Sequence, residues 1–269
     1  MSRIQNVTAG IDHSPRGLPP LRPAPAAPEP PARGPLPRAE KVLAVIARPG
    51  QESTDLGALL YAFRRGGASL VVLCVTRGEA SPLNSTNERL ETRRPWELLV
   101  AGAVIGISSF TVADYPDGRL TGSLLAELTE LVQREIRWHA PDLLLIVDPA
   151  ADRPGAGAAS DSSDEAAPAG DSSDEAAPAG DSSDDAVVAR AARAAARLAG
   201  VPAVARTMPG VRGARLVDLG ADPATARAVQ RSATAAHASQ SEALPEVERH
   251  LGLLDGRETL RWLATAPVS

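Results

Sequence analysis

The sequence predicts an α/β fold of three layers, in which a Rossmann-like, mostly parallel sheet carries helices on both faces. Short apolar runs typical of buried strands alternate with longer segments of helical periodicity. This alternation indicates parallel strands joined by right-handed crossovers. The runs predicted as strands are 41–47, 69–75, 109–114 and 142–148, and the segments predicted as helices between them are 53–66, 93–105 and 121–139.

The first predicted strand, 41–47, is rich in β-branched residues and short enough to be buried on both faces. It ends at the turn Arg48–Gln51. Polar residues at 52–55 then introduce the first helix, and their side chains are candidates for its N-cap. Ligands of open α/β folds bind at the carboxyl edge of the sheet. The turn after the first strand is therefore the predicted functional site.

The later elements complete one predicted domain, which spans 40–265. Asp222 and Pro223 indicate a helix start, because aspartate favours the N-cap and proline the first helical position. The elements expected here are an alanine-rich helix over 185–199, strands at 201–207 and 215–219, a helix over 222–236 and a last helix near 256–264.

Two segments lack the apolar periodicity of a folded domain. Residues 1–39 are rich in proline and are predicted to be an extended or disordered tail, since they cannot bury enough surface to offset ordering entropy. An acidic insert at about 150–183 interrupts the domain, and it contains the decapeptide DSSDEAAPAG twice without change. A solenoid repeat needs an apolar face of its own, so this insert is predicted to be a solvated, low-complexity loop.

Composition excludes several classes of function. The formal charge of −5 at pH 7 argues against a nucleic-acid partner. The single cysteine, Cys74, excludes an intrachain disulfide framework and is expected to be a buried small side chain. No apolar run reaches the length of a membrane span and no signal pattern opens the chain, so a cytoplasmic protein without membrane contact is expected.

Five short motifs occur in a fixed order along the domain. They read A-R-P-G-Q-E at 47–52, T-R-G-E at 76–79, R-P-W-E at 94–97, Y-P-D-G at 115–118 and H-A-S-Q at 237–240. In this order they resemble the PIG-L/LmbE family of zinc-dependent N-acetylglucosaminyl deacetylases, whose signature at the first position is A-H-P-D-D-E. The resemblance implies the fold of that family and hydrolysis of the amide in an N-acetylated amino-sugar conjugate.

The residues implied to hold zinc in this family are different here. In the family, the histidine and the second aspartate of the signature bind zinc, the first aspartate is the general base, and a later H-P-D-H motif supplies the third ligand. This chain has Arg48, Gln51 and Gly50 at those signature positions, and the nearest alignment of the later motif is Ser182–Asp185. A guanidinium has no lone pair to donate to a metal. No cofactor is therefore predicted, although zinc is expected for the family.

These departures predict a pseudoenzyme that binds a small ligand, anionic or sugar-like, or a partner. Arg48 is expected to occupy the metal position, with its charge neutralised by Glu52, Asp117 or Asp184. No catalytic residue is assigned, and the remaining candidates are Glu52, Asp117 and Asp184. The predicted ligand-binding residues are Arg48, Gln51, Glu52, Asn84, Asp117, Asp184, Asp185 and His237.

Two other functions stay open. One is an active amide hydrolase that removes an N-acetyl group from an amino-sugar conjugate, either without metal or with a metal held by Glu52, Asp184 and Asp185. The other is a scaffolding protein that uses the proline-rich tail and the acidic insert as interaction arms. The sequence leaves the oligomeric state undetermined.

Overall fold

The computed structural model describes residues 33–148, 182–253 and 256–264. The predicted tail up to residue 32 and the predicted insert up to residue 181 lie outside these residues. A short strand at 33–35 begins the described chain, inside the segment predicted to be tail.

Among the described residues, eight strands form one sheet in the order β1-β7-β8-β6-β5-β2-β3-β4. Neighbouring strands are parallel except that β8 runs antiparallel to both β6 and β7. The strands are β1 (Arg33–Pro35), β2 (Lys41–Ile46), β3 (Ser69–Thr76), β4 (Ser109–Tyr115), β5 (Leu143–Val147), β6 (Ala203–Arg206), β7 (Ala214–Asp218) and β8 (Arg257–Ala264).

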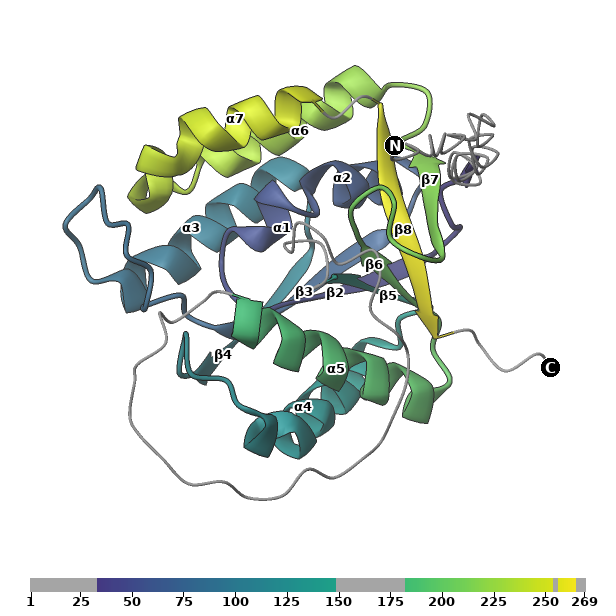
Figure 1. Cartoon of the computed structure of the whole chain (residues 1–269), viewed down its shortest axis with the longest axis horizontal. Coiled ribbons are helices and arrows are strands. Elements are labelled where there is room, and N and C mark those ends of the chain that lie inside the picture. Colours follow the sequence, from purple (N-terminus) through teal and green to yellow (C-terminus); the bar gives the residue numbers. More distant parts are fainter. Residues whose placement is uncertain (1–32, 149–181, 254–255, 265–269) are drawn as a thin grey trace, which may run out of the picture. The chain divides into compact units, whose positions relative to one another are not determined.

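Helices cover both faces of this sheet (Figure 1). Helices α4 and α5 pack on one face, where they share a hydrophobic core with β2, β3 and β5. The other α-helices lie on the opposite face, where α2, α3 and α6 enclose a second core. The predicted three-layer α/β architecture is therefore confirmed. The α-helices are α1 (Gln51–Thr54), α2 (Gly57–Arg65), α3 (Leu90–Ile105), α4 (Leu125–His139), α5 (Ser182–Ala199), α6 (Pro223–Ala235) and α7 (Leu244–Leu253), and two 3₁₀ helices are η1 (Gly122–Leu124) and η4 (Ala238–Ala243).

Strand β2 is buried on both faces, as its apolar run predicts. Val42, Ala44 and Ile46 pack into the core beneath α2. Leu43 and Val45 point to the other side and pack with α4 and α5. This alternation fixes the register of β2, because a shift by one residue would exchange the two faces.

The last predicted helix, near 256–264, is wrong. Residues 257–264 form β8, which lies between β6 and β7 and pairs with both. Arginine, glutamate, leucine and alanine favour a helix locally. Pairing with one strand on each side outweighs this helix preference. Strand formation depends strongly on neighbouring strands, which the local sequence does not reveal.

The first predicted helix begins earlier than expected and is broken in two. Helix α1 begins at Gln51 after Gly50, which has a φ of 108° and supplies no side-chain cap, and α2 follows from Gly57. The polar residues at 52–55 therefore lie in α1 and the turn after it. The N-cap predicted for α6 is confirmed, since the carboxylate of Asp222 accepts a hydrogen bond from the Thr225 amide at 3.1 Å.

The strand order changes direction at β2, and this positions the site. The chain moves from β2 to β3 and β4 on one side, and then crosses to β5 on the other side. The turn after β2 therefore lies at a topological switch point, where open α/β folds bind their ligands. Of the described helices, none is long and apolar enough to cross a lipid bilayer.

Candidate functional site

Four segments meet at the carboxyl end of β2. They are the turn after β2, the turn after β3, the loop after β4 and the first turn of α5, and hydrogen bonds connect them. Six of the eight predicted ligand-binding residues lie in these segments and in α1, and His237 reaches them from the residue before η4.

Arg48, Gln51 and Asp185 form one connected cluster. The Arg48 guanidinium donates to both carboxylate oxygens of Asp185, over 3.3 and 3.5 Å. The Gln51 amide donates to the same carboxylate at 2.9 Å, and its carbonyl oxygen accepts from the Ala47 amide at 2.8 Å. Asp185 therefore pairs with Arg48, and it is a partner that the expectation of Glu52, Asp117 or Asp184 did not include.

Glu52 instead pairs with His237 inside the protein. Its Oε1 lies 2.6 Å from Nε2 of His237 and also accepts from the Ser53 hydroxyl at 2.6 Å, while Oε2 accepts from the Gly50 amide at 2.8 Å. Glu52 is fully buried and His237 nearly so. Burial alone would raise the pKa of Glu52, but the charge and hydrogen bonds of His237, with those from Ser53 and Gly50, hold that pKa below its ordinary value.

Asp117 and Asp184 hold the loop after β4 in place. The Asp117 carboxylate accepts from the Thr76 hydroxyl at 3.1 Å and from the Ala80 amide at 3.0 Å. Asp184, in the first turn of α5, accepts from the amides of Gly118 and Leu120 at 2.6 and 2.9 Å. Burial raises the pKa of Asp184, and the nearby charge of Asp117 acts in the same direction. Together these bonds attach α5 to the sheet edge.

Asn84 lies apart from the other predicted residues. Its side-chain amide donates to the Glu88 carbonyl at 2.9 Å, and its side-chain carbonyl accepts from the Thr86 hydroxyl at 3.2 Å. These bonds close its own loop. The neighbouring Ser85 amide nevertheless reaches the carbonyl of Ser239 at 3.0 Å, which joins this loop to η4.

Arg94 and Glu97, one helical turn apart in α3, bind different segments. Arg94 turns toward the site and donates to the carbonyls of Gly78 and Pro49, both at 2.6 Å. Glu97 accepts from the amide and hydroxyl of Ser239 at 2.8 and 2.6 Å, and from Arg93 at 2.8 Å. The R-P-W-E segment thus joins the turns after β2 and β3 to the H-A-S-Q segment.

A cavity of about 190 Å³ opens beside the turn after β2. Arg48, Gln51 and His237 line it, whereas the other predicted ligand-binding residues do not. Most residues that line this cavity were not predicted as ligand-binding residues, although Arg94 and Gln240 belong to the R-P-W-E and H-A-S-Q motifs. The remaining lining residues are Pro49, Gly50, Thr54, Asp55, Arg94, Thr234, Gln240, Ala243 and Leu244.

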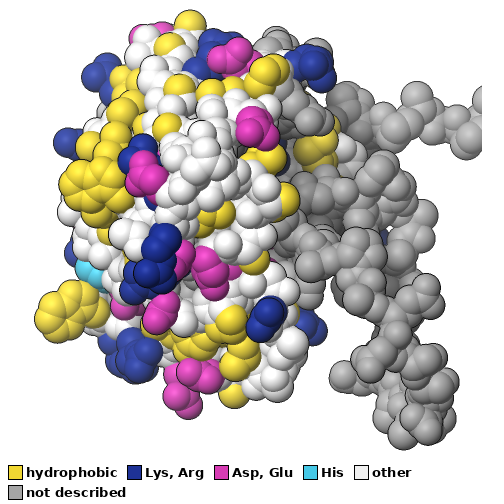
Figure 2. Space-filling view, turned by 90° about the vertical axis from the view of Figure 1, so that its left-hand side faces the viewer, with side chains coloured by type: hydrophobic (Ala, Val, Ile, Leu, Met, Phe, Trp, Pro, Cys, Tyr) yellow, Lys and Arg dark blue, Asp and Glu magenta, His cyan; other side chains and the backbone are white. Residues whose placement is uncertain are grey.

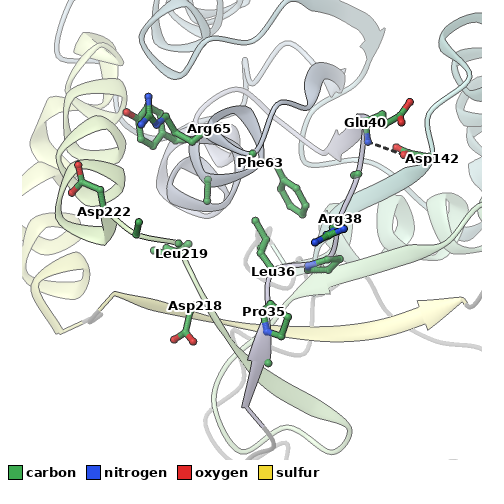
Figure 3. Close-up of a pocket in the computed structure, with 18 residues that line it drawn as sticks. Pro35, Leu36, Arg38, Glu40, Phe63, Arg65, Asp142, Asp218, Leu219 and Asp222 are labelled. Carbon is green, nitrogen blue, oxygen red and sulfur yellow. Dashed lines mark hydrogen bonds between the residues drawn. The ribbon is translucent and has the colours of Figure 1, made fainter.

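A larger cavity, of about 1260 Å³, lies beside β1 and the end of α2 (Figure 3). Leu36 and Phe63 extend into it, and the Glu40 amide donates to Asp142 at 2.7 Å at its border. Glu40 and Asp142 precede β2 and β5, so this cavity lies at the end of those strands opposite to the turn at Arg48. None of the motif residues lines it.

The described residues contain no group of three or more histidine, cysteine, aspartate or glutamate side chains arranged to hold a metal ion. Asp184 and Asp185 are neighbours in sequence, but their carboxylates contact different segments. The Glu52 carboxylate binds His237. The side chains named for a carboxylate metal site are therefore not gathered in this arrangement.

The sequence of residues 43–158 matches the family model described as PIG-L, GlcNAc-PI de-N-acetylase. No curated protein matches the chain significantly. Among solved structures, the antimicrobial A40926 pseudoaglycone deacetylase is similar, with a TM-score of 0.57, 17% identity and coverage of 86% of this chain and 99% of that one.

Two further solved structures show the range of activities carried by similar folds. The N,N'-diacetylchitobiose deacetylase from Pyrococcus horikoshii has a TM-score of 0.57 and 16% identity, with 83% of this chain and 84% of that one covered. The 4-carboxy-2-hydroxymuconate hydratase from Pseudomonas putida has a TM-score of 0.52 and 15% identity, with 85% and 98% covered. At such identities these structures establish the fold alone. The family match and the fold together confirm that this chain resembles the PIG-L family.

Proposed function

We propose that this protein is a non-catalytic relative of the PIG-L deacetylases that binds a small ligand beside the turn after β2. One observation supports this most directly. The two signature positions to which the resemblance assigns zinc ligands hold Arg48 and Gln51, and both side chains bind Asp185, which aligns with a histidine of the later motif. The positive charge of a guanidinium takes the place of a metal ion beside the Asp185 carboxylate.

The donor set of this cluster does not fit zinc. Zinc sites use imidazole, thiolate or carboxylate ligands with lone pairs directed at the ion. Arg48 offers none and would repel a dication, while the Gln51 carbonyl oxygen already accepts hydrogen bonds from backbone amides. Gly50, at the position of the general base, cannot transfer a proton. We therefore propose no metal-dependent step for this chain.

The proposed ligand is a small molecule, anionic or sugar-like. The cavity beside Arg48 has room for only a few groups, and its wall contains hydrogen-bonding side chains of several kinds. The named relatives act on a pseudoaglycone and on a diacetylchitobiose. The nature of their substrates supports a polar small molecule and leaves the substrate of this protein to experiment. The expected cytoplasmic location also stays a prediction.

Metal analysis of the purified protein tests the proposal. We expect well under one equivalent of zinc after purification, and no saturable zinc binding in a titration against a competing chelator. The Asp185→Asn variant should behave as the wild type does. One tightly bound equivalent of zinc that is lost in Asp185→Asn would contradict the proposal.

An amide hydrolase is the second candidate, and the buried Glu52–His237 pair favours it. A carboxylate and an imidazole 2.6 Å apart can relay a proton, as general acid–base catalysis requires. Release of acetate from N-acetylglucosamine conjugates, abolished by Glu52→Gln, would support this candidate. Sensitivity of that activity to a chelator would further assign it to a metal.

A further inference from the structure

Arg94 is a buried cation without a carboxylate partner among the described residues. Its residue exposure is 5%, and its two terminal nitrogens donate to the neutral carbonyls of Gly78 and Pro49. Its Nε has no hydrogen-bond partner. A buried charge is costly unless it is paired and hydrogen-bonded, so this arrangement indicates a missing anion.

The guanidinium of Arg94 is held in place at the wall of the 190 Å³ cavity. A Cβ added to Gly78 would lie only 2.5 Å from Nη1 and 2.9 Å from Nε, so the plane packs directly on the backbone of this turn. Gly50 leaves similar room on another side, where a Cβ would be 3.8 Å from Nη2. The position is therefore fixed before any ligand arrives, which lowers the entropic cost of binding.

A second guanidinium, that of Arg48, lines the same cavity. Burial lowers the pKa of Arg94, the charge of Asp117 acts against this, and the charge of Arg48 lowers that pKa further. Asp55 is the one carboxylate in the cavity lining, and it lies 3.8 Å from Arg206. Arg48 is paired with Asp185, whereas the hydrogen bonds of Arg94 go to neutral carbonyls, so an anion in the cavity would supply the charge partner that Arg94 lacks.

We propose that the cavity binds a small organic carboxylate, which lies between the guanidinium groups of Arg94 and Arg48. The volume of about 190 Å³ corresponds to roughly six water-sized groups. Thr54, Thr234 and Gln240 provide hydrogen-bonding groups around the cavity, and Leu244 and Ala243 provide apolar surface for a short carbon chain. This inference rests on the proposed function and specifies the class of ligand.

Isothermal titration of the full chain with butyrate, butyramide and inorganic phosphate at fixed ionic strength tests the inference. Butyrate and butyramide share their shape and differ in charge, while phosphate shares only the charge. We expect butyrate to bind at least about tenfold more tightly than either. Equal binding of butyrate and butyramide, or binding of phosphate in preference to butyrate, would overturn the proposal.

Two variants and one control identify the binding group. Arg94→Gln should weaken butyrate binding at least about tenfold, and Arg89→Gln, which removes an exposed arginine one residue before α3, should change it less than about twofold. Because Arg94→Gln can also destabilise the fold, Ala243→Phe fills the cavity from η4 without touching a charge, and should abolish binding. Unchanged butyrate affinity in folded Ala243→Phe, or in folded Arg94→Gln, would refute the assignment.

Metal content and acetate release, measured on the same samples, separate this inference from the proposed function. A zinc-loaded, acetate-releasing protein that still binds butyrate through Arg94 would remove the proposed function and retain the carboxylate site. A metal-free, inactive protein that does not distinguish butyrate from butyramide would retain the proposed function and remove the carboxylate site.

Discussion

The Arg48–Asp185 pair joins two segments that are 137 positions apart in the sequence. The Asp185 side chain is 4% exposed and that of Arg48 is 15% exposed, so solvent screens the pair only in part. Gln51 donates to the same carboxylate, which adds a third group to the cluster. Such a cluster holds the turn after β2 against the start of α5 when each member is satisfied, but it is sensitive to the loss of any one member.

Replacement of Arg48 by methionine should destabilise the protein. The variant keeps most of the side-chain volume but removes the cation beside a buried carboxylate, and we expect a loss of about 2 kcal/mol in the free energy of unfolding. Urea denaturation followed by circular dichroism measures it. The control is Arg89→Met, at a pair in which the arginine side chain is 84% exposed, where the loss should stay below about 0.5 kcal/mol.

The buried Glu52 carboxylate should make stability depend on acid pH. Because the pKa of Glu52 is lower in the folded state, its contribution is fully present above the ordinary value of 4.5 and is lost as pH falls through the lower folded value. Glu52→Gln should therefore flatten the fall in unfolding free energy below about pH 4.5, measured by urea denaturation across a pH series.

Asp184 provides a test of opposite sign. Its pKa is raised in the folded state, so the ionised group weakens the fold as pH rises through that raised value. Asp184→Asn should remove this loss of unfolding free energy with rising pH. A plot of unfolding free energy against pH for this variant should therefore diverge from the plot for Glu52→Gln. Parallel curves for the wild type and both variants would contradict the two assignments.

At the scale of elements, the turn after β3 depends on a glycine for two reasons. Gly78 has a φ of 74°, and a Cβ there would lie 2.5 Å from the Arg94 guanidinium. Gly210 also has a positive φ, of 90°, but a Cβ there meets nothing within 4 Å. The two positions thus separate the backbone penalty from the steric one.

We expect Gly210→Ala to cost about 1 kcal/mol of unfolding free energy, since only the left-handed backbone disfavours alanine. Gly78→Ala should cost at least about 1 kcal/mol more, because the guanidinium must also move away from the backbone of this turn. Chemical denaturation of both variants measures the difference. Equal losses would show that Arg94 does not pack on the turn as described.

Sequence patterns identify most of the elements but not the faces that they bury. In α3, Trp96, Leu99, Val100 and Val104 are exposed although they are apolar, and hydrophobic side chains gather on the side of the molecule that carries this helix (Figure 2). Apolar residues almost all round a helix leave its buried face undetermined. The strand β8 was missed for a related reason, since its position depends on β6 and β7 rather than on its own composition.

At the scale of the whole molecule, the sequence predicts that the candidate site residues meet, because the parallel sheet brings the carboxyl ends of β2, β3 and β5 to one edge. The pairing within the site could not be predicted in this way. Asp184 and Asp185 are adjacent acidic residues at the start of α5, and the rotation of that helix decides which one reaches Arg48. The packing of α5 on α4 and on the sheet sets this rotation.

The contact between the side chains of Arg48, Gln51 and Asp185 predicts that a metal site can be restored at these positions. The variant Arg48→His, Gly50→Asp, Gln51→Asp, Asp185→His places two imidazoles and a carboxylate where three contacting side chains now lie, and those types suit zinc. Zinc at about a hundred times its dissociation constant adds roughly 2.7 kcal/mol, or about 5–10 °C in Tm. Thermal unfolding with and without zinc measures this shift.

The control for that variant retains Asp185 and carries the other three substitutions. With one imidazole fewer it should bind zinc more weakly and show a smaller rise in Tm, while the wild type should show none. The comparison depends on the fold holding three distant positions together, because an isolated turn could not supply ligands from both β2 and α5. A rise in the wild type as large as in the full variant would mean that Arg48 moves aside for a metal, and that the ion pair does not take its place.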